Sequence, residues 1–133
     1  YDELCSQLGG KNLPAIGMAI GIERLASLVN TLENTNTLLS FIILSSKIEQ
    51  KAYKIAHNLR LLNNKINLDV QLSKGSLKSK LRRANKDNAS YALIIGEEEL
   101  KSNTVVVKPL LDKNSQQSSM SLSELYDFVR SLT

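Results

Sequence analysis

The sequence predicts an α/β fold in which a mixed sheet of about five strands carries helices packed on it. Along residues 36–133, short apolar runs typical of strands alternate with segments whose apolar residues recur every three or four positions, as on one helix face. Two serines followed three residues later by glutamate match the capping box that starts helices. The predicted order is strand, helix, strand, helix, three strands and a last helix.

The first part of this region predicts two strands separated by a helix. The apolar run Phe41–Ser45 is the first strand, and the Ser46–Glu49 capping box opens the helix. The apolar face of that helix comprises Ile48, Ala52, Ile55, Ala56, Leu59 and Leu62. Apolar and polar residues alternate over Ile66–Leu72, which predicts a half-buried strand.

The second part predicts a short basic helix, three strands and a final helix. Ser76 is placed to cap the basic helix, whose inner face would hold Leu77, Leu81 and Ala84. The three strands are expected at Tyr91–Ile95, Thr104–Lys108 and Ser118–Met120. A capping box at Ser121–Glu124 opens the last helix, which should turn inward Leu122, Leu125, Val129 and Leu132.

Residues 1–35 predict a separate strand and helix. The glycine-punctuated run Asn12–Gly21 is expected as a buried strand, and a helical face follows with Ile22, Leu25, Val29 and Leu32. On a strand, Gly17 and Gly21 would share one face and leave a shallow floor for a flat ring, while Arg24 could reach a phosphate. An ordinary sheet bend with an exposed Glu23–Arg24 pair fits the same spacing. A linker is expected at Glu33–Thr37.

A cluster of basic residues is the clearest candidate for a binding surface. Its members are Lys74, Lys78, Lys80, Arg82, Arg83 and Lys86. Because the apolar residues of this helix should face inward, we expect the charges to point outward, where they suit a phosphate backbone. A solvated helix face would have the same pattern. Polar groups that could read unstacked RNA bases are Gln71, Ser73, Glu97 and Asn103.

Composition narrows the class of protein. The chain has 133 residues, is 42% hydrophobic and carries a net charge of +4, of which residues 1–35 contribute −2 and residues 36–133 contribute +6. It has no membrane-length apolar run and no signal-peptide pattern, and the single Cys5 excludes an internal disulfide. We therefore expect a cytoplasmic protein with no membrane partner. Because it begins at Tyr1, we also expect it to be part of a longer protein.

Metal binding and cysteine chemistry are not expected. His57 lies beside the apolar stripe of its helix and has no second ligand at metal spacing. Cys5 has no histidine nearby in the sequence that could activate it as a nucleophile.

The first segment resembles the end of a class II aminoacyl-tRNA synthetase catalytic domain. The resemblance rests on "YDELCSQLGG", Pro14-Ala15 and "GMAIGIERL", and it is closest to the histidyl-tRNA synthetases, with Ile22 in place of a leucine. It implies that Tyr1 lies beside the histidine substrate and that Gly17, Ala19 and Gly21 floor the adenylate site. Arg24 would contact the ATP phosphates and stabilise the leaving pyrophosphate.

The rest of the chain is similar to the anticodon-binding domain shared by histidyl, prolyl, threonyl and glycyl enzymes. "YALIIGEEEL" followed by "TVVVK" is its most specific part, with Gly96, Glu97 and Glu99 in the turn between two strands. "SLKSKLRRANK" matches the basic helix of the family only in part: the family commonly has Lys-Gln at Ser79-Lys80 and Ala-Asp at Ala84-Asn85. The resemblance implies that residues 1–35 are the end of the catalytic domain and that residues 36–133 are the anticodon-binding domain.

The function implied is that of a histidine–tRNA ligase, which activates histidine with ATP and Mg²⁺ and transfers it to histidine tRNA. The intact enzyme would be a homodimer, and this part would mainly recognise the anticodon. The isolated chain is expected to be inactive and to bind no cofactor, because half of the adenylate site is missing. Two alternatives stay open: a non-catalytic synthetase-like RNA-binding or regulatory protein, and another class II synthetase of the same subclass.

Overall fold

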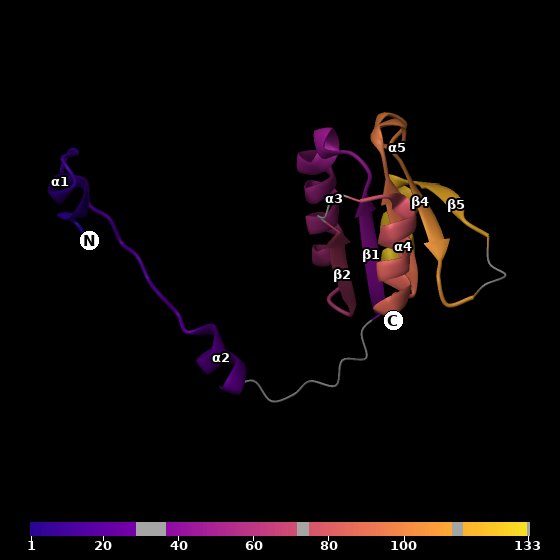
Figure 1. Cartoon of the computed structure of the whole chain (residues 1–133), viewed down its shortest axis with the longest axis horizontal. Helices are drawn as coiled ribbons and strands as arrows, with labels where there is room; N and C mark the ends of the chain where they lie inside the picture. Colours follow the sequence, from indigo (N-terminus) through magenta and orange to yellow (C-terminus); the bar gives the residue numbers. More distant parts are fainter. Residues whose placement is uncertain (29–36, 72–74, 113–115, 133) are drawn as a thin grey trace. The chain divides into compact units, whose positions relative to one another are not determined.

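In the computed structural model, the chain divides into two units, residues 1–34 and 35–133 (Figure 1). The structure describes residues 1–28, 37–71, 75–112 and 116–132. The predicted helix residues Val29 and Leu32, most of the predicted linker, and Ser73 and Lys74 lie outside these ranges.

The described residues of the first unit, 1–28, form two short helices, α1 (Leu4–Gln7) and α2 (Ile22–Leu28). The helix predicted after Gly21 is therefore present, but the predicted strand at 12–21 is wrong, because these residues belong to no helix or strand and are exposed. A strand is stabilised by hydrogen bonds to a neighbouring strand, and the described residues of this unit contain none. Consequently, the argument that Gly17 and Gly21 share one strand face does not hold.

The second unit is built on one five-stranded sheet. Its strands are β1 (Thr37–Ile43), β2 (Ile66–Gln71), β3 (Tyr91–Ile95), β4 (Thr104–Pro109) and β5 (Ser118–Ser121), in the spatial order β2-β1-β3-β4-β5. The central strand β1 pairs in parallel with both β2 and β3. β4 pairs antiparallel with β3 and with β5. The prediction of a mixed sheet of five strands is confirmed.

Helices cover the two faces of this sheet unequally. The main core lies on one face and includes Leu39, Phe41, Leu93 and Val105 under the 3-10 helix η1 (Ser46–Ile48), α3 (Glu49–Leu62) and α6 (Leu122–Ser131). The other face carries α4 (Leu77–Lys86) over the smaller cluster of Ile42, Ala92 and Ile94. α4 thus packs on the sheet with few large apolar side chains.

Most predicted helix faces are confirmed. Ala52, Ile55, Ala56 and Leu59 of α3 are buried, as are Leu125 and Val129 of α6. Two predicted caps also form: Ser76 Oγ accepts the Ser79 backbone N–H, and Ser121 exchanges hydrogen bonds with Glu124.

Four local predictions differ from the structure. Leu77, predicted on the inner face of α4, is exposed at the first turn of that helix. The first strand begins at Thr37 rather than Phe41. The Ser46–Glu49 capping box does not form, because the chain enters α3 through η1 and Ser45 is the residue that accepts the Lys47 N–H. The turn after Gly96 is a five-residue helix, α5 (Glu97–Lys101).

Candidate nucleic-acid interface

Polar contacts fasten α4 to the carboxyl end of the parallel strands. Lys80 Nζ donates to the carbonyl of Ile43, the last residue of β1, at 2.5 Å. Gln71 Nε2 donates to the Lys80 carbonyl at 2.9 Å and to Ser40 Oγ at 2.8 Å. Lys80 and Gln71 are only 7% and 1% exposed. The prediction that every cation of this helix points outward is therefore wrong for Lys80, and Gln71 does not present its side chain to solvent.

Arg83 is exposed but paired with acidic residues. Its guanidinium lies 3.5 Å from a carboxylate oxygen of Asp69 on β2 and 3.5 Å from one of Asp87. The Asp69 pair links one flank of α4 to β2, the Asp87 pair lies at the end of α4 itself, and both partly neutralise the positive charge of Arg83. Arg83 is consequently less available to an external phosphate than its neighbour Arg82.

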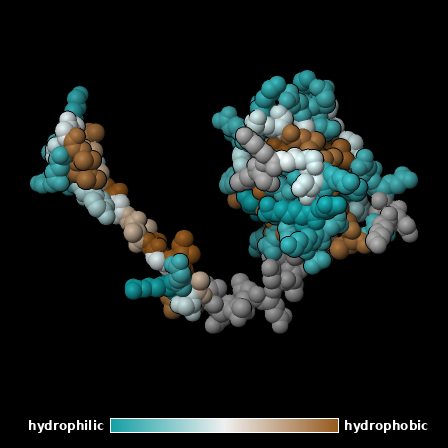
Figure 2. Space-filling model, viewed as in Figure 1, coloured by the Kyte–Doolittle hydropathy of each residue, from teal (hydrophilic) through white to brown (hydrophobic). Residues whose placement is uncertain are grey.

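Three cations form a stripe on the outward side of α4. Lys78, Arg82 and Lys86 are exposed and follow one another at intervals of four residues, about 6 Å of rise per step. The described part of the chain gives none of the three an acidic partner within ion-pair distance. Figure 2 shows hydrophilic residues over this side of the domain. We call these three residues the α4 stripe; Lys74 lies outside the described ranges.

Beside α4, the sheet presents a polar face. Val105 and Val107 of β4 are buried in the main core, so Val106 and Lys108 point to the α4 side. Ser119 of β5 is paired in register with Val106 and shares its face. Among the described helices only α4 packs on this side, and in Figure 1 β4 and β5 lie next to it without a helix in front.

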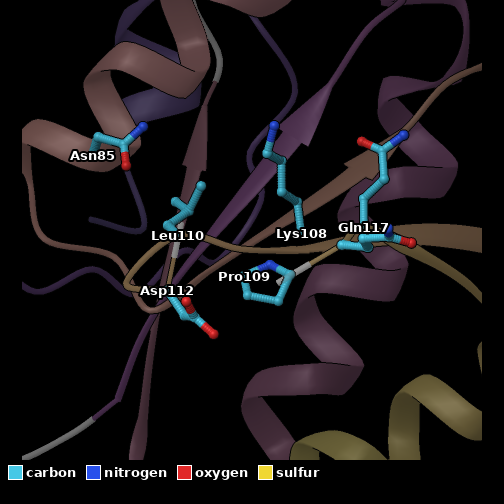
Figure 3. A pocket seen from close by; sticks show the side chains of 7 residues that line it. Asn85, Lys108, Pro109, Leu110, Asp112 and Gln117 are labelled. Atoms are coloured by element: carbon cyan, nitrogen blue, oxygen red, sulfur yellow. The ribbon is translucent and has the colours of Figure 1, made fainter. Parts of the chain in front are cut away.

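A pocket of about 490 Å³ lies where α4 meets this polar face. It is lined by Asn85, Lys108, Pro109, Leu110, Asp112, Gln116 and Gln117. Figure 3 shows Asn85 on one side and Lys108 and Gln117 on the other. Asn85 Nδ2 donates to the Leu81 carbonyl at 2.9 Å, which fixes the amide at the helix surface. Amide groups of this kind both donate and accept hydrogen bonds, as base edges require.

The pocket residues were not among the sequence-based candidates. A two-residue period places Lys108 on the opposite side of β4 from the buried Val107, so the sequence did carry a signal for Lys108. No comparable local signal marks Asn85 or Gln117, which meet only because the sheet brings β5 beside β4 and α4.

Glu97 lies at a second place on the domain, at the start of α5. It accepts a hydrogen bond from Ser45 Oγ at 2.8 Å and lies 3.9 Å from Lys47 Nζ, so its carboxylate is already engaged. The preceding Gly96 N–H donates to Glu99 Oε2 at 2.9 Å, and a Cβ at Gly96 would lie 2.6 Å from that oxygen. Asn103, which follows α5, is exposed and has a φ of 54°.

Four of the residues predicted to bind histidine and ATP in the first unit form two close pairs, Tyr1 with Gly17 and Gly21 with Arg24. The Tyr1 ring lies against the backbone of Gly17, where an added Cβ would be 2.9 Å from Tyr1 Cε2. The aliphatic part of Arg24 packs near Gly21, and Ala19 is exposed. The Asp2 carboxylate accepts the backbone N–H of Ala15 at 3.1 Å.

The described residues form neither a metal-binding cluster nor a membrane-spanning helix. Within these residues, no three His, Cys, Asp or Glu side chains are grouped so that they could hold a metal ion. None of the helices that the structure describes has the length and apolar character needed to cross a membrane.

A five-stranded mixed sheet with a cationic helix and a polar open face on one side defines a small α/β domain with a candidate surface for an anionic ligand. The chain belongs to the anticodon binding domain family, whose model matches residues 39–132. It is 38% identical to the histidine–tRNA ligase of Vesicomyosocius okutanii subsp. Calyptogena okutanii (strain HA) and 39% identical to that of Ruthia magnifica subsp. Calyptogena magnifica. Each match covers 98% of this chain, which spans about a third (32%) of the length of these relatives.

Solved structures share the fold. A histidyl-tRNA synthetase from Nostoc sp. PCC 7120 matches with a TM-score of 0.64 at 22% identity, over 82% of this chain and 26% of that one. The RNA binding domain of threonyl-tRNA synthetase from Cryptosporidium parvum Iowa II matches with a TM-score of 0.65 at 20% identity, over 72% of this chain and 23% of that one. At these identities, the likeness concerns the fold alone.

Proposed function

We propose that this chain is the part of a histidine–tRNA ligase that recognises the anticodon of histidine tRNA. One observation carries the proposal: in a domain of the anticodon-binding family, the exposed α4 stripe and the polar pocket lie on the same side of the sheet. Cations along the helix suit the RNA backbone, and the adjacent amides suit unstacked bases.

The residues have distinct roles in this proposal. Lys78, Arg82 and Lys86 bind phosphates, and Asn85, Lys108 and Gln117 hydrogen-bond to a base in the pocket. Glu97 is a further base-reading candidate, although RNA would have to compete with Ser45 for its carboxylate. Lys80 and Gln71 are buried and support the helix instead of contacting RNA.

Residues 1–35 are, in the same proposal, the end of a catalytic domain. Their large apolar side chains, among them Leu8, Ile16, Met18 and Leu28, are exposed in the described part of this unit, and burial in a larger domain would remove that surface from water. Tyr1 would then lie beside histidine, Gly17, Ala19 and Gly21 would floor the adenylate, and Arg24 would stabilise the pyrophosphate. The intact protein would be a cytoplasmic homodimer that uses ATP with Mg²⁺.

Binding to histidine tRNA tests the RNA part of the proposal. The chain is titrated with the tRNA and with a copy whose anticodon is mutated, at low and at physiological salt. We expect tighter binding to the unmutated tRNA at both salt concentrations. Equal binding that disappears with salt would show only a positive surface meeting RNA and would contradict anticodon reading.

Two triple variants that lose the same charge test whether α4 is the surface that contacts tRNA. Replacing Lys78, Arg82 and Lys86 by Gln should lower the slope of log K against log salt by about 2. Replacing Lys51, Lys54 and Lys65 by Gln removes the same charge from elsewhere on the domain and should leave most of the slope intact. Similar losses in both variants would exclude α4 as the contact surface.

The catalytic part of the proposal is tested by enzyme assay. The isolated chain should form no histidyl-adenylate from histidine and ATP, because the other half of the site lies outside it. Adenylate formation by the purified chain would contradict this expectation.

A further inference from the structure

Lys80 is a buried cation without a buried anion beside it. Its side chain is 7% exposed, and its ammonium donates to the Ile43 carbonyl. No carboxylate in the described part of the chain lies within ion-pair distance of it. Removing an ammonium from water without a counter-charge is unfavourable, and an apolar side chain of similar length would fill the space at lower cost. Packing alone therefore does not explain a lysine here.

The position of its hydrogen bond suggests what the ammonium does. Ile43 is the last residue of β1, and its carbonyl lies at the carboxyl end of the parallel strands. The same residue of α4 is held a second time through its backbone, because its carbonyl accepts from Gln71 of β2. Lys80 thus ties one turn of α4 to two neighbouring strands, one through its side chain and one through its main chain.

The apolar contacts under α4 are few and come from small or partly buried side chains. The cluster on this face contains Ile42, Ala92 and Ile94, with Leu81, Val106 and Leu110 packed against it, and α4 adds the buried Ala84. Apolar burial is non-directional, whereas the Lys80 and Gln71 hydrogen bonds have the directional geometry that selects one rotation of the helix about its axis.

The rotation of α4 decides where the stripe points. At about 100° per residue, Lys78 and Arg82 lie about 160° from Lys80 on either side, and Lys86 lies about 120° from it. A helix that turns Lys80 to the strand ends must therefore turn the stripe away from the sheet. Burial of Lys80 and exposure of the stripe are two consequences of one rotation.

We propose that Lys80 is a positioning residue for RNA binding: its buried ammonium sets the rotation of α4 and so orients Lys78, Arg82 and Lys86 toward phosphates. The inference rests on the proposed RNA-binding function. It predicts that Lys80 strengthens RNA binding without contacting RNA.

Two methionine variants on the same helix provide the test. Lys80→Met keeps the length of the side chain and removes the buried charge, and Lys78→Met makes the same chemical change in the stripe. Three quantities are measured for each: the urea midpoint, amide hydrogen exchange, and tRNA affinity at several salt concentrations.

For Lys80→Met, we expect an unchanged or higher urea midpoint, because a buried charge is replaced by an apolar group. The α4 amides should exchange about tenfold faster than in the parent chain, and tRNA binding should weaken by roughly tenfold, since a hydrogen bond to a charged group is lost. The slope of log K against log salt should not change. Lys78→Met should leave exchange unchanged and lower the slope by about 0.7 to 0.9.

Two results for Lys80→Met would contradict the proposal. A reduced slope in Lys80→Met would mean that Lys80 contacts phosphate directly, and unchanged affinity would mean that its role is structural only; either result overturns the proposal. If Lys80→Met does not fold, Gln71→Met, which removes the second tie, must show the faster exchange and the unchanged slope. Should the parent chain not bind tRNA, the proposed function fails, while the exchange data still decide whether Lys80 sets α4 in place.

Discussion

The capping box of α6 contains a carboxylate whose contribution to stability depends on pH. Ser121 N–H donates to Glu124 Oε2 at 2.7 Å, and Ser121 Oγ lies 2.8 Å from the same oxygen. The pKa of Glu124 is lowered, first by the backbone hydrogen bond and then by the hydroxyl, since both favour the charged carboxylate. Because the pKa of Glu124 is lower in the folded state than in the unfolded state, the ionised carboxylate stabilises the folded domain. This stabilisation is fully present at pH values above the unfolded-state pKa and is lost as the pH falls through the folded-state pKa.

Replacing Glu124 by Gln should therefore reduce the acid sensitivity of the domain. The parent chain should lose more of its urea midpoint between about pH 6 and about pH 3 than Glu124→Gln does. Glu98→Gln removes another exposed carboxylate, one outside this capping box, and serves as the control. An identical pH dependence for the parent chain and Glu124→Gln would show that the capping carboxylate does not contribute.

At the scale of elements, α4 contains three kinds of cation. Lys80 is buried against the end of β1, Arg83 is paired with Asp69 and Asp87, and Arg82 is exposed without an acidic partner among the described residues. Helix periodicity distributes these roles, because positions four apart share a face and adjacent positions do not. Counting basic residues in the sequence overstates how many of them can reach a phosphate.

Adjacent arginines test this distinction with the same chemical change. Arg82→Gln should lower the slope of log K against log salt for tRNA by about 0.7 to 0.9, while Arg83→Gln should lower it less. Arg83→Gln should instead reduce stability, by no more than about 0.5 kcal/mol because its ion pairs are half exposed. Urea titration and binding isotherms measure both effects. A larger slope change for Arg83→Gln would reverse the assignment.

At the scale of the whole molecule, the two units differ in what stabilises them. The second unit has a core of buried side chains from β1, β2, β3, β4, α3 and α6, whereas none of the described residues of the first unit is buried. The second unit therefore has the physical means to fold alone, and the first unit does not bury enough surface to do so.

Hydrogen exchange should separate the units. Amides of residues 12–21 should exchange almost as in an unfolded peptide, because among the hydrogen bonds between described residues only the Ala15 amide of this stretch is a donor, to the Asp2 side chain. Amides of β1 and β3 should be protected about a thousandfold or more. Deleting residues 1–34 should leave the urea midpoint unchanged. Strong protection across 12–21 or a large loss on deletion would show that the first unit is stabilised.

Most helices and strands of the second unit can be predicted from short stretches of sequence. Periodicity identified the buried faces of α3 and α6, the alternation of β2, and the caps at Ser76 and Ser121, because each depends on residues close in the chain. The resemblance named the family before the structure showed the sheet order. Neither periodicity nor the resemblance predicted α5, because this helix is too short for a periodic pattern. They also did not predict the cap at Ser45, whose hydroxyl donates a hydrogen bond to Glu97, 52 residues away.

The candidate surface, by contrast, depends on contacts between residues that are far apart in the sequence. The strand expected at 12–21 fails because pairing needs a second strand, which no single segment contains. Lys80 is buried because β1 ends with a carbonyl within its reach and Gln71 holds the same turn. Asn85, Lys108 and Gln117 are distant in the sequence and line the same pocket. The sequence specified local faces and ends, whereas burial of a charge and the meeting of distant side chains depend on where the sheet places them.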